Sequence, residues 1–171
     1  MSAEQYPNLL RHINYIFDAH QKLAKKDENT VRGDNETPYS IHPVWCSMMI
    51  ATETSLSREI RIEGTIVLLY HDVSEDTNAS LPNDLSPEII QSISDMTFMG
   101  GMKEEMVEIW SKSQKIRLFK LYDKVSNLLD ASWMPPDYLP KYVGHTKRLL
   151  DDVEKHYGSL NIVKIAHSIV D

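Results

Sequence analysis

The sequence predicts an all-α fold in a single domain that spans residues 1–171. Apolar residues recur every three or four positions along most of the chain, which is typical of helices with one buried face. No stretch alternates polar and apolar residues convincingly with the period of two that marks a half-buried strand. The length of 171 residues suits one domain with a sizeable core, and no internal repeat is detectable.

The first two helices are expected on either side of a polar loop. Helix-spaced apolar residues place the first helix over residues 7–26, and the loop "KDENTVRGDNETPYS" follows it. Pro43 suits the first position of a second helix over 43–54, which puts His42 at or near its N-cap.

The remaining helices begin and end at recognisable signals. Ser57 can cap a third helix over 58–73, and its β-branched patch at 65–67 is still assigned to helix because no other strand is available to pair with it. Ser86 and Pro87 start the fourth helix. The pair Gly100–Gly101 and a proline-rich turn separate some of the rest, so the later helices are expected near 87–97, 102–110, 113–131, 137–157 and 159–170.

Composition excludes several classes of function. The formal net charge of −7 argues against a broad nucleic-acid surface, which needs clustered Lys and Arg. The longest apolar run, Ile66 to Tyr70, is far shorter than the ~20 residues that span a bilayer. The N-terminus lacks the order of a signal peptide, and Cys46 is the only cysteine, so we expect a cytoplasmic protein without disulfides.

One stretch carries the strongest chemical signal: "EGTIVLLYHDVSEDTNAS", residues 63–80. His71 and Asp72 follow an apolar run directly, and on a helix their side chains can converge on one point beside the axis. Glu75 and Asp76 lie one turn further along. An imidazole with a carboxylate suits a divalent ion such as manganese, iron or zinc.

Two residues elsewhere could complete such a site. His42, in "PYSIHPV", lies at a helix start where its side chain can project freely. Asp123, in "FKLYDKVSNLLD", has apolar neighbours and is expected to face the interior, where a lone carboxylate is costly unless it is paired or bound to metal. Asn127 follows on the same helix face and could hydrogen-bond there.

A plainer interpretation of these residues stays open at this point. The segment "HDVSED" could be a solvated helix end, and Asp123 could form a salt bridge with Lys120 or Lys124. The five histidines not included in the motif are expected on the surface or in packing contacts: His12, His20, His145, His156 and His167.

Four segments together resemble a known family. "AHQKLAKK", "TPYSIHP", "LLYHDVSEDT" and "FKLYDKVSNLLD" are similar to the four blocks of the HD-domain alarmone hydrolases. These are the hydrolase half of the RelA/SpoT proteins and their stand-alone small relatives. The order and spacing of the blocks agree over roughly residues 9–131. The resemblance implies a helical HD-domain bundle with one divalent ion, usually Mn²⁺.

The resemblance also implies a site and a reaction. The metal ligands would be His42, His71, Asp72 and Asp123, and the acidic pair would be Glu75 and Asp76. Glu75 would orient or deprotonate water, while Asp76 would support it or handle the leaving oxygen. The reaction would remove the 3′-pyrophosphate from ppGpp or pppGpp, giving GDP or GTP. The implied contacts to the small nucleotide substrate are Lys25, Lys26, Arg32, Tyr39 and Asn127.

The chain departs from the family where the base is recognised. Lys25 and Lys26 replace an Arg-Lys pair, and Lys stacks less well on a base than planar guanidinium does. Arg32, in a longer connector, is a candidate to replace the missing Arg. A different nucleotide, such as ppApp, a dNMP or NADPH, is therefore the alternative substrate, and a non-catalytic binding protein is a third hypothesis.

The role and assembly of the protein follow less directly from the sequence. A chain that ends at residue 171 leaves no room for a synthetase domain, so we expect it only to degrade its substrate. The oligomeric state stays open, with a homo-oligomer among the options. Housekeeping and antitoxin roles are both compatible with the sequence.

Overall fold

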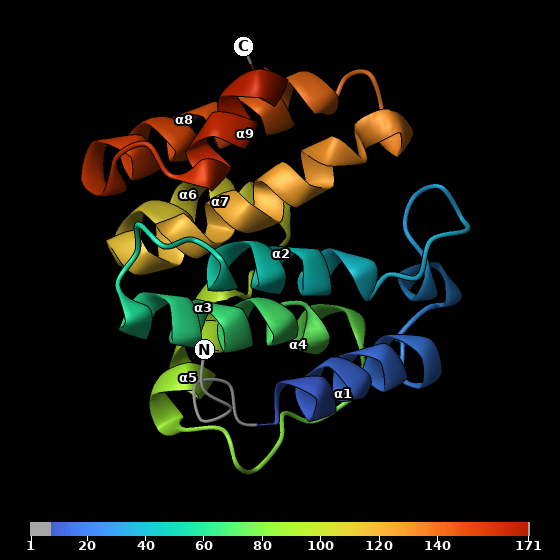
Figure 1. The fold of residues 1–171 in the computed structure, drawn as a ribbon. Coiled ribbons are helices and arrows are strands. Elements are labelled where there is room, and N and C mark those ends of the chain that lie inside the picture. The colour runs from blue at the N-terminus through green and yellow to red at the C-terminus, as the bar shows by residue number, and fades with distance from the viewer. Residues whose placement is uncertain (1–7, 171) are drawn as a thin grey trace.

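The computed structural model describes residues 8–170, and within this range the chain is helical, with two isolated β-bridges and no β-strand (Figure 1). The α-helices are α1 (Leu9–Lys22), α2 (Ile41–Ala51), α3 (Arg58–Tyr70), α4 (Val73–Asp76), α5 (Pro87–Met96), α6 (Met102–Glu108), α7 (Gln114–Leu129), α8 (Leu139–Tyr157) and α9 (Asn161–Val170). Short 3₁₀ segments are η1 (Asp27–Thr30), η2 (Ile109–Ser111) and η3 (Ala131–Trp133). The predicted all-α fold class is confirmed.

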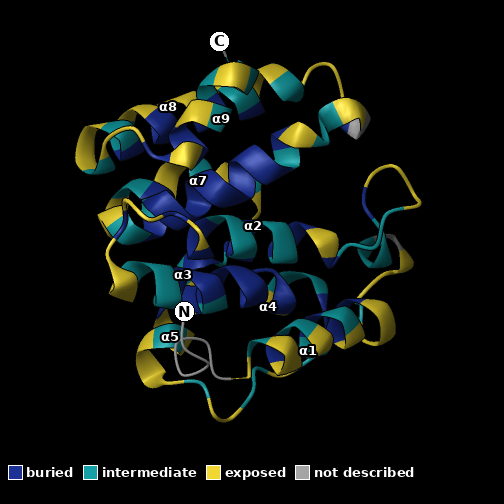
Figure 2. Cartoon of the chain, viewed as in Figure 1, coloured by how far each residue is buried: buried dark blue, intermediate teal, exposed yellow. Residues whose placement is uncertain are grey.

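The longer helices stack on one another across the molecule. In Figure 1 the order runs from α1 at the bottom through α3, α2 and α7 to α8 and α9 at the top, and each neighbour in this order is in contact. Helix α7 lies in the middle, and Figure 2 shows it as the most continuously buried element. A carboxylate on this helix therefore reaches the interior from a rigid support.

Close packing between α2, α3 and α7 determines where the ends of α2 and α3 lie. At Gly64 in α3, an added Cβ would lie 2.5 Å from Cδ1 of Ile50 in α2 and 2.8 Å from Cε1 of Phe119 in α7. Glycine therefore lets the side chains of Ile50 and Phe119 pack against the α3 backbone, and a larger residue would require them to shift. The C-terminal end of α3 is thereby held against the first turn of α2.

Serine caps start several helices where the sequence indicated. The hydroxyls of Ser57 and Ser86 accept hydrogen bonds from the backbone N–H groups of Ile60 and Ile89, which satisfies donors that the first turn leaves unpaired. Pro87 occupies the first turn of α5, as predicted from its missing N–H.

Three predicted boundaries near the site were wrong. Helix α1 ends at Lys22, because Ala24 turns away to form a β-bridge with Thr77. Helix α2 begins at Ile41 and not at 43, so Ser40 is the N-cap and His42 lies near it, inside the first turn. The predicted helix over 58–73 is interrupted after Tyr70. At this break the Leu68 carbonyl accepts from the His71 ring, whereas in a continuous helix it would accept from the Asp72 backbone N–H.

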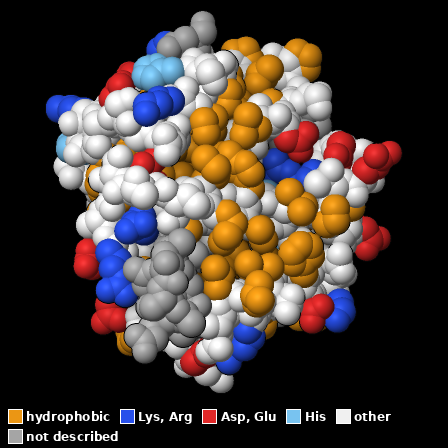
Figure 3. All heavy atoms as spheres, in the orientation of Figure 1, with side chains coloured by type: hydrophobic (Ala, Val, Ile, Leu, Met, Phe, Trp, Pro, Cys, Tyr) orange, Lys and Arg blue, Asp and Glu red, His pale blue; other side chains and the backbone are white. Residues whose placement is uncertain are grey.

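The length and polarity of the helices and the side chains on one face describe the surface. No helix there is both long and apolar enough to cross a bilayer. On the face drawn in Figure 3, hydrophobic side chains form an irregular band down the middle, with charged side chains mostly towards the edges.

Candidate metal centre and adjoining cavity

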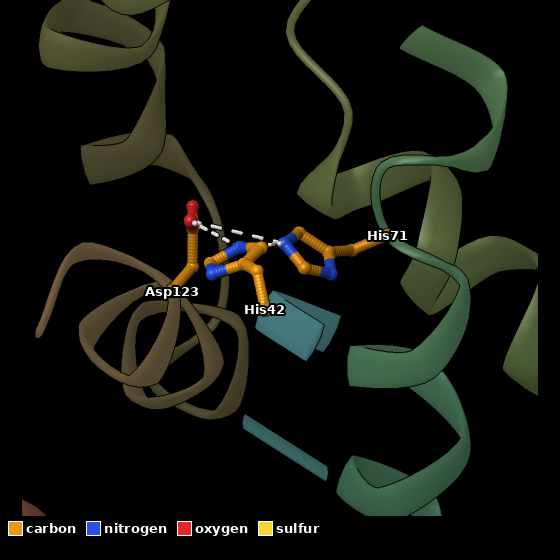
Figure 4. A group of neighbouring side chains, drawn as sticks. All are labelled: His42, His71 and Asp123. Atoms are coloured by element: carbon orange, nitrogen blue, oxygen red, sulfur yellow. Dashed lines mark hydrogen bonds and ion pairs between the residues drawn. The ribbon is translucent and has the colours of Figure 1, made fainter. Parts of the chain in front are cut away.

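Four predicted ligands from three elements lie together in the interior. His42 comes from the first turn of α2, His71 and Asp72 from the break between α3 and α4, and Asp123 from the middle of α7. Figure 4 shows His42, His71 and Asp123 pointing toward a common centre. All four are buried, with at most 8% of their surface exposed.

The donor atoms are spaced as ligands of a single ion would be. The two Nε2 atoms of His42 and His71 are 3.3 Å apart. Oδ1 of Asp123 lies 3.4 Å from Nε2 of His42 and 3.8 Å from Nε2 of His71. Oδ2 of Asp72 is 3.5 Å from Nε2 of His42, and its Oδ1 is 3.2 Å from Nε2 of His71. Two ligands each ~2.1 Å from one ion are separated by roughly 3.0–3.6 Å. Four of the five distances lie in this range and the Asp123–His71 distance of 3.8 Å lies just above it, so the set is compatible with one divalent cation.

Outer hydrogen bonds orient both imidazoles. Nδ1 of His71 lies 2.9 Å from the carbonyl oxygen of Leu68, and a carbonyl can only accept, so this nitrogen carries the proton. Nδ1 of His42 lies 2.8 Å from the Ser126 hydroxyl, which can accept in the same way. Each Nε2 can therefore offer a lone pair to the centre, as metal-binding histidines do.

The electrostatics of the four groups also suit a cation. Burial lowers the pKa of His42, which favours its neutral, ligating form. Burial also opposes charge on His71, but the carboxylates of Asp72 and Asp123 outweigh it and raise its pKa to about 9. A proton on this ring and a metal ion compete for the same nitrogen.

Asp123 divides its two oxygens between different partners. Burial alone would raise the pKa of Asp123, but the Lys120 and Lys124 ammoniums hold it well below its usual range. Oδ2 accepts from Nζ of Lys120 at 3.0 Å and lies 3.3 Å from Nζ of Lys124. Oδ1 faces the histidines and accepts from the Asn127 amide at 2.7 Å. The sequence left metal binding and a salt bridge as alternatives for Asp123, and the geometry provides for both.

A cavity of about 490 Å³ opens beside the centre, which is the size range of small-molecule sites. Asp72 and Asp123 form part of its wall. Cationic groups in the described part of the wall are Arg32, Lys120 and Lys124. Aromatic rings also line it, from Tyr39, Phe98, Tyr138 and Tyr142.

Glu75 and Asp76 contribute carboxylates to the same wall. Oε1 of Glu75 accepts from the Phe98 backbone N–H at 2.7 Å, and Oδ1 of Asp76 accepts from the Asn29 amide at 3.1 Å. Burial and the nearby Asp72 carboxylate raise the pKa of Glu75. The same two causes raise the pKa of Asp76 to about 7.

The predicted substrate contacts fall into two groups. Arg32, Tyr39 and Asn127 line the cavity. Lys25 and Lys26 do not belong to the described wall, and the Lys25 ammonium instead donates to the carbonyls of Ser74 and Glu75 at 2.7 and 3.0 Å. Lys25 therefore stabilises helix α4 from outside the cavity.

Arg32 is held in place within the cavity wall. Its Nε donates to Oδ2 of Asp130 at 3.2 Å, and its Nη1 donates to Oδ1 of Asn127 at 3.1 Å. Its guanidinium carbon also lies 5.8 Å from the centre of the Tyr39 ring, and the Tyr39 hydroxyl donates to Oδ2 of Asp72 at 2.9 Å. The loop that carries Arg32 is thus linked to two of the predicted ligands.

Sequence reasoning did not assign Glu105 or Ser126 to the site. Ser126 lies on α7, and its hydroxyl contacts Nδ1 of His42. Glu105 lies in a segment without a matching motif, and only the position of α6 brings it to the wall. An acidic residue on a short helix gives no signal of this role in the sequence.

Comparisons with known proteins agree with this architecture. No protein-family profile matches the chain. A curated relative from Xenopus tropicalis, the guanosine-3′,5′-bis(diphosphate) 3′-pyrophosphohydrolase MESH1, is 24% identical over 139 residues, which covers 75% of this chain and 72% of the relative. A solved metazoan ortholog of SpoT, which hydrolyzes ppGpp and plays a role in starvation responses, superposes with a TM-score of 0.71 at 21% identity. That match covers 95% of this chain and 93% of the other.

The chain has an HD-domain helical fold. The predicted resemblance to the stand-alone alarmone hydrolases is confirmed by both comparisons.

Proposed function

We propose that the protein is a metal-dependent pyrophosphohydrolase that removes the 3′-pyrophosphate of (p)ppGpp-type alarmones, giving GDP or GTP and pyrophosphate. The observation that carries this proposal is the convergence of His42, His71, Asp72 and Asp123 at the edge of a nucleotide-sized cavity that also holds Glu75 and Asp76. The resemblance to MESH1 supports the choice of substrate.

Manganese is the ion that we propose for the centre. Two imidazole nitrogens and two carboxylate oxygens form a mixed donor set that suits a divalent transition ion. When bound there, such an ion lowers the pKa of a water molecule and neutralises charge on a diphosphate. The chain's own ligands hold their orientation through Leu68, Ser126 and Tyr39.

The acidic pair is proposed to manage protons. A raised pKa makes the Glu75 carboxylate a stronger base toward the attacking water, and its hydrogen bond from the Phe98 backbone fixes its direction. Asp76, with a pKa of about 7 in the metal-free protein, can hold a proton near neutral pH. It is therefore suited to protonate the ribose 3′-oxygen as that oxygen leaves.

The nucleoside is proposed to bind at the wall formed by Arg32, Tyr39 and Asn127. Arg32 offers a planar cation inside the cavity, whereas the Lys25 ammonium donates to backbone carbonyls of helix α4. We therefore propose that Arg32 takes the base-contacting role that the family assigns to the position of Lys25. A small nucleotide substrate, no nucleic-acid partner and a reducing cytoplasm remain our expectations for its setting.

A panel of nucleotides tests the function. Purified protein with Mn²⁺ is offered ppGpp, pppGpp, ppApp, dNMPs and NADPH, and both pyrophosphate and phosphate are measured. Release of pyrophosphate from ppGpp with GDP as co-product is the expected result. Phosphate from a dNMP or NADPH, with no pyrophosphate from any alarmone, would overturn the proposal in favour of another HD-domain phosphohydrolase.

A further inference from the structure

A closed ring of four charged groups lies directly behind Asp123. Nζ of Lys120 is 3.0 Å from Oδ2 of Asp123 and 3.3 Å from Oε2 of Glu105. Nζ of Lys124 is 3.3 Å from the same Asp123 oxygen and 2.7 Å from the same Glu105 oxygen. Two carboxylate oxygens thus alternate with two ammoniums, and all four residues are at most 6% exposed.

Each of the two lysines also has an aromatic ring beside its ammonium. The Lys120 ammonium lies 5.3 Å from the centre of the Phe98 ring, and the Lys124 ammonium lies 5.1 Å from that of Tyr142. Each ammonium is therefore committed to two carboxylates and one ring face. Both lysines line the cavity, but each ammonium already has two carboxylate partners, which favours a structural task for the pair over a direct substrate contact.

Glu105 is anchored from the opposite side. Its Oε1 lies 2.9 Å from Nε2 of His145 in α8, and because an ionised carboxylate only accepts, the ring donates. Lys120, Lys124 and Asp123 all belong to α7, whereas Glu105 comes from the short helix α6. Helices α6 and α8 are thus tied to the metal ligand on α7.

The ring determines how Asp123 can meet an ion. Because Oδ2 is used by both lysines, only Oδ1 points to the centre, and Asp123 is restricted to one ligating oxygen. Asp123 and Glu105 together balance the two ammoniums. Without the Glu105 charge, the ring would carry an uncompensated positive charge beside the cation, and both ammoniums would draw on the Asp123 carboxylate alone.

We propose that Glu105 is a positioning residue of the metal centre: it balances Lys120 and Lys124 so that Asp123 presents Oδ1 with its negative charge to the ion. This inference rests on the proposed metal-dependent function. Glu105 itself lies outside the ligand set and acts only through the lysines.

Metal affinity measured without substrate tests the inference. Mn²⁺ is titrated calorimetrically into the metal-free wild type, Glu105→Gln and the control Glu63→Gln. The control removes a comparable carboxylate, because Glu63 pairs with Lys115 of α7 at 2.6 Å but does not line the cavity. Glu105→Gln is expected to weaken Mn²⁺ binding by ~10–100-fold, the usual effect of losing an outer partner of a ligand, and Glu63→Gln to leave it unchanged.

A double variant separates charge balance from general damage. Glu105→Gln with Lys124→Met removes one charge of each sign, and it is expected to bind Mn²⁺ more tightly than Glu105→Gln alone. If Glu105→Gln is too unstable to titrate, the Mn²⁺ affinity of the double variant is compared with that of Lys124→Met alone. The double variant is then expected to bind Mn²⁺ more weakly than Lys124→Met. Unchanged affinity on losing Glu105, in either background, overturns the inference while leaving the proposed function intact. A wild type that binds no Mn²⁺ overturns both.

Discussion

Nδ1 of His71 lies 2.9 Å from the carbonyl oxygen of Leu68, one turn earlier in α3. This contact lies where the helix ends, fixes the tautomer of the ring and directs Nε2 to the centre. We expect His71→Ala to lose Mn²⁺ affinity by more than the ~10–100-fold that is typical of losing an outer partner, because a ligand itself is removed. His156→Ala, which removes a histidine of α8 that lies outside the site and pairs with Asp152, is the matched control. Equal calorimetric affinity in the two variants would contradict the assignment of His71 as a ligand.

A substitution at Glu75 can separate metal binding from the catalytic step. Glutamine at this position can still accept from the Phe98 backbone N–H but cannot take a proton from water. Glu75→Gln is therefore expected to keep its Mn²⁺ affinity and to lose ~10²–10⁴-fold in kcat, the usual contribution of a general base. Calorimetry and initial rates on ppGpp measure the two quantities. Near-normal turnover would remove Glu75 from its proposed role.

More of the fold than of the site could be predicted from the residues themselves. The serine caps and the buried face of α7 were predictable because they depend on residues close in sequence. The ligand set was reached only through the resemblance, since spacing alone could not choose between a metal and a salt bridge for Asp123. The geometry provides for both, because a carboxylate has two oxygens.

Tertiary placement explains what the sequence missed. Glu105 reaches Lys124 only because α6 packs beside α7, and no local pattern encodes that contact. Lys25 was expected in the substrate site because it matches a motif position. Helix α1 ends early, at Lys22, and the Lys25 ammonium instead caps α4. The predicted helix over residues 7–26 did not indicate this contact.

The stability of the metal-free protein should depend on pH through Asp76. Its pKa of about 7, raised from 3.8 by burial and by Asp72, means that the folded state favours the protonated carboxyl. The stability that this group contributes therefore falls as pH rises from about 4 through about 7, where the folded protein must carry a partly buried charge. Asp76→Asn mimics the protonated form and keeps an oxygen for the Asn29 amide.

The measurement is thermal unfolding in EDTA at pH 5 and at pH 8.5. We expect Asp76→Asn to melt at a higher temperature than the wild type at pH 8.5, by ~2–4 °C for each kcal/mol gained, and the difference to be clearly smaller at pH 5. Adding Mn²⁺ should narrow the gap at pH 8.5, because a bound cation stabilises the ionised carboxylate of the wild type. The same gain at both pH values would show that Asp76 does not titrate in this range.

Arg32 is linked to the proposed ligand Asp123 through Asn127. Its Nη1 donates to Oδ1 of Asn127, and the Asn127 amide donates to Oδ1 of Asp123. Lysine keeps the charge but cannot reproduce the planar guanidinium or reach two acceptors in parallel. We expect Arg32→Lys to raise KM for ppGpp by ~10-fold or more, in line with the ~1.5–3 kcal/mol of a hydrogen bond to a charged group, with a smaller effect on kcat.

Arg117→Lys changes the same side-chain type on α7, at an ion pair with Asp152 that does not line the cavity, and should leave both constants unchanged. If Arg32→Lys lowered kcat and left KM unaltered, Arg32 would act on the metal centre through Asn127 and not on the nucleoside.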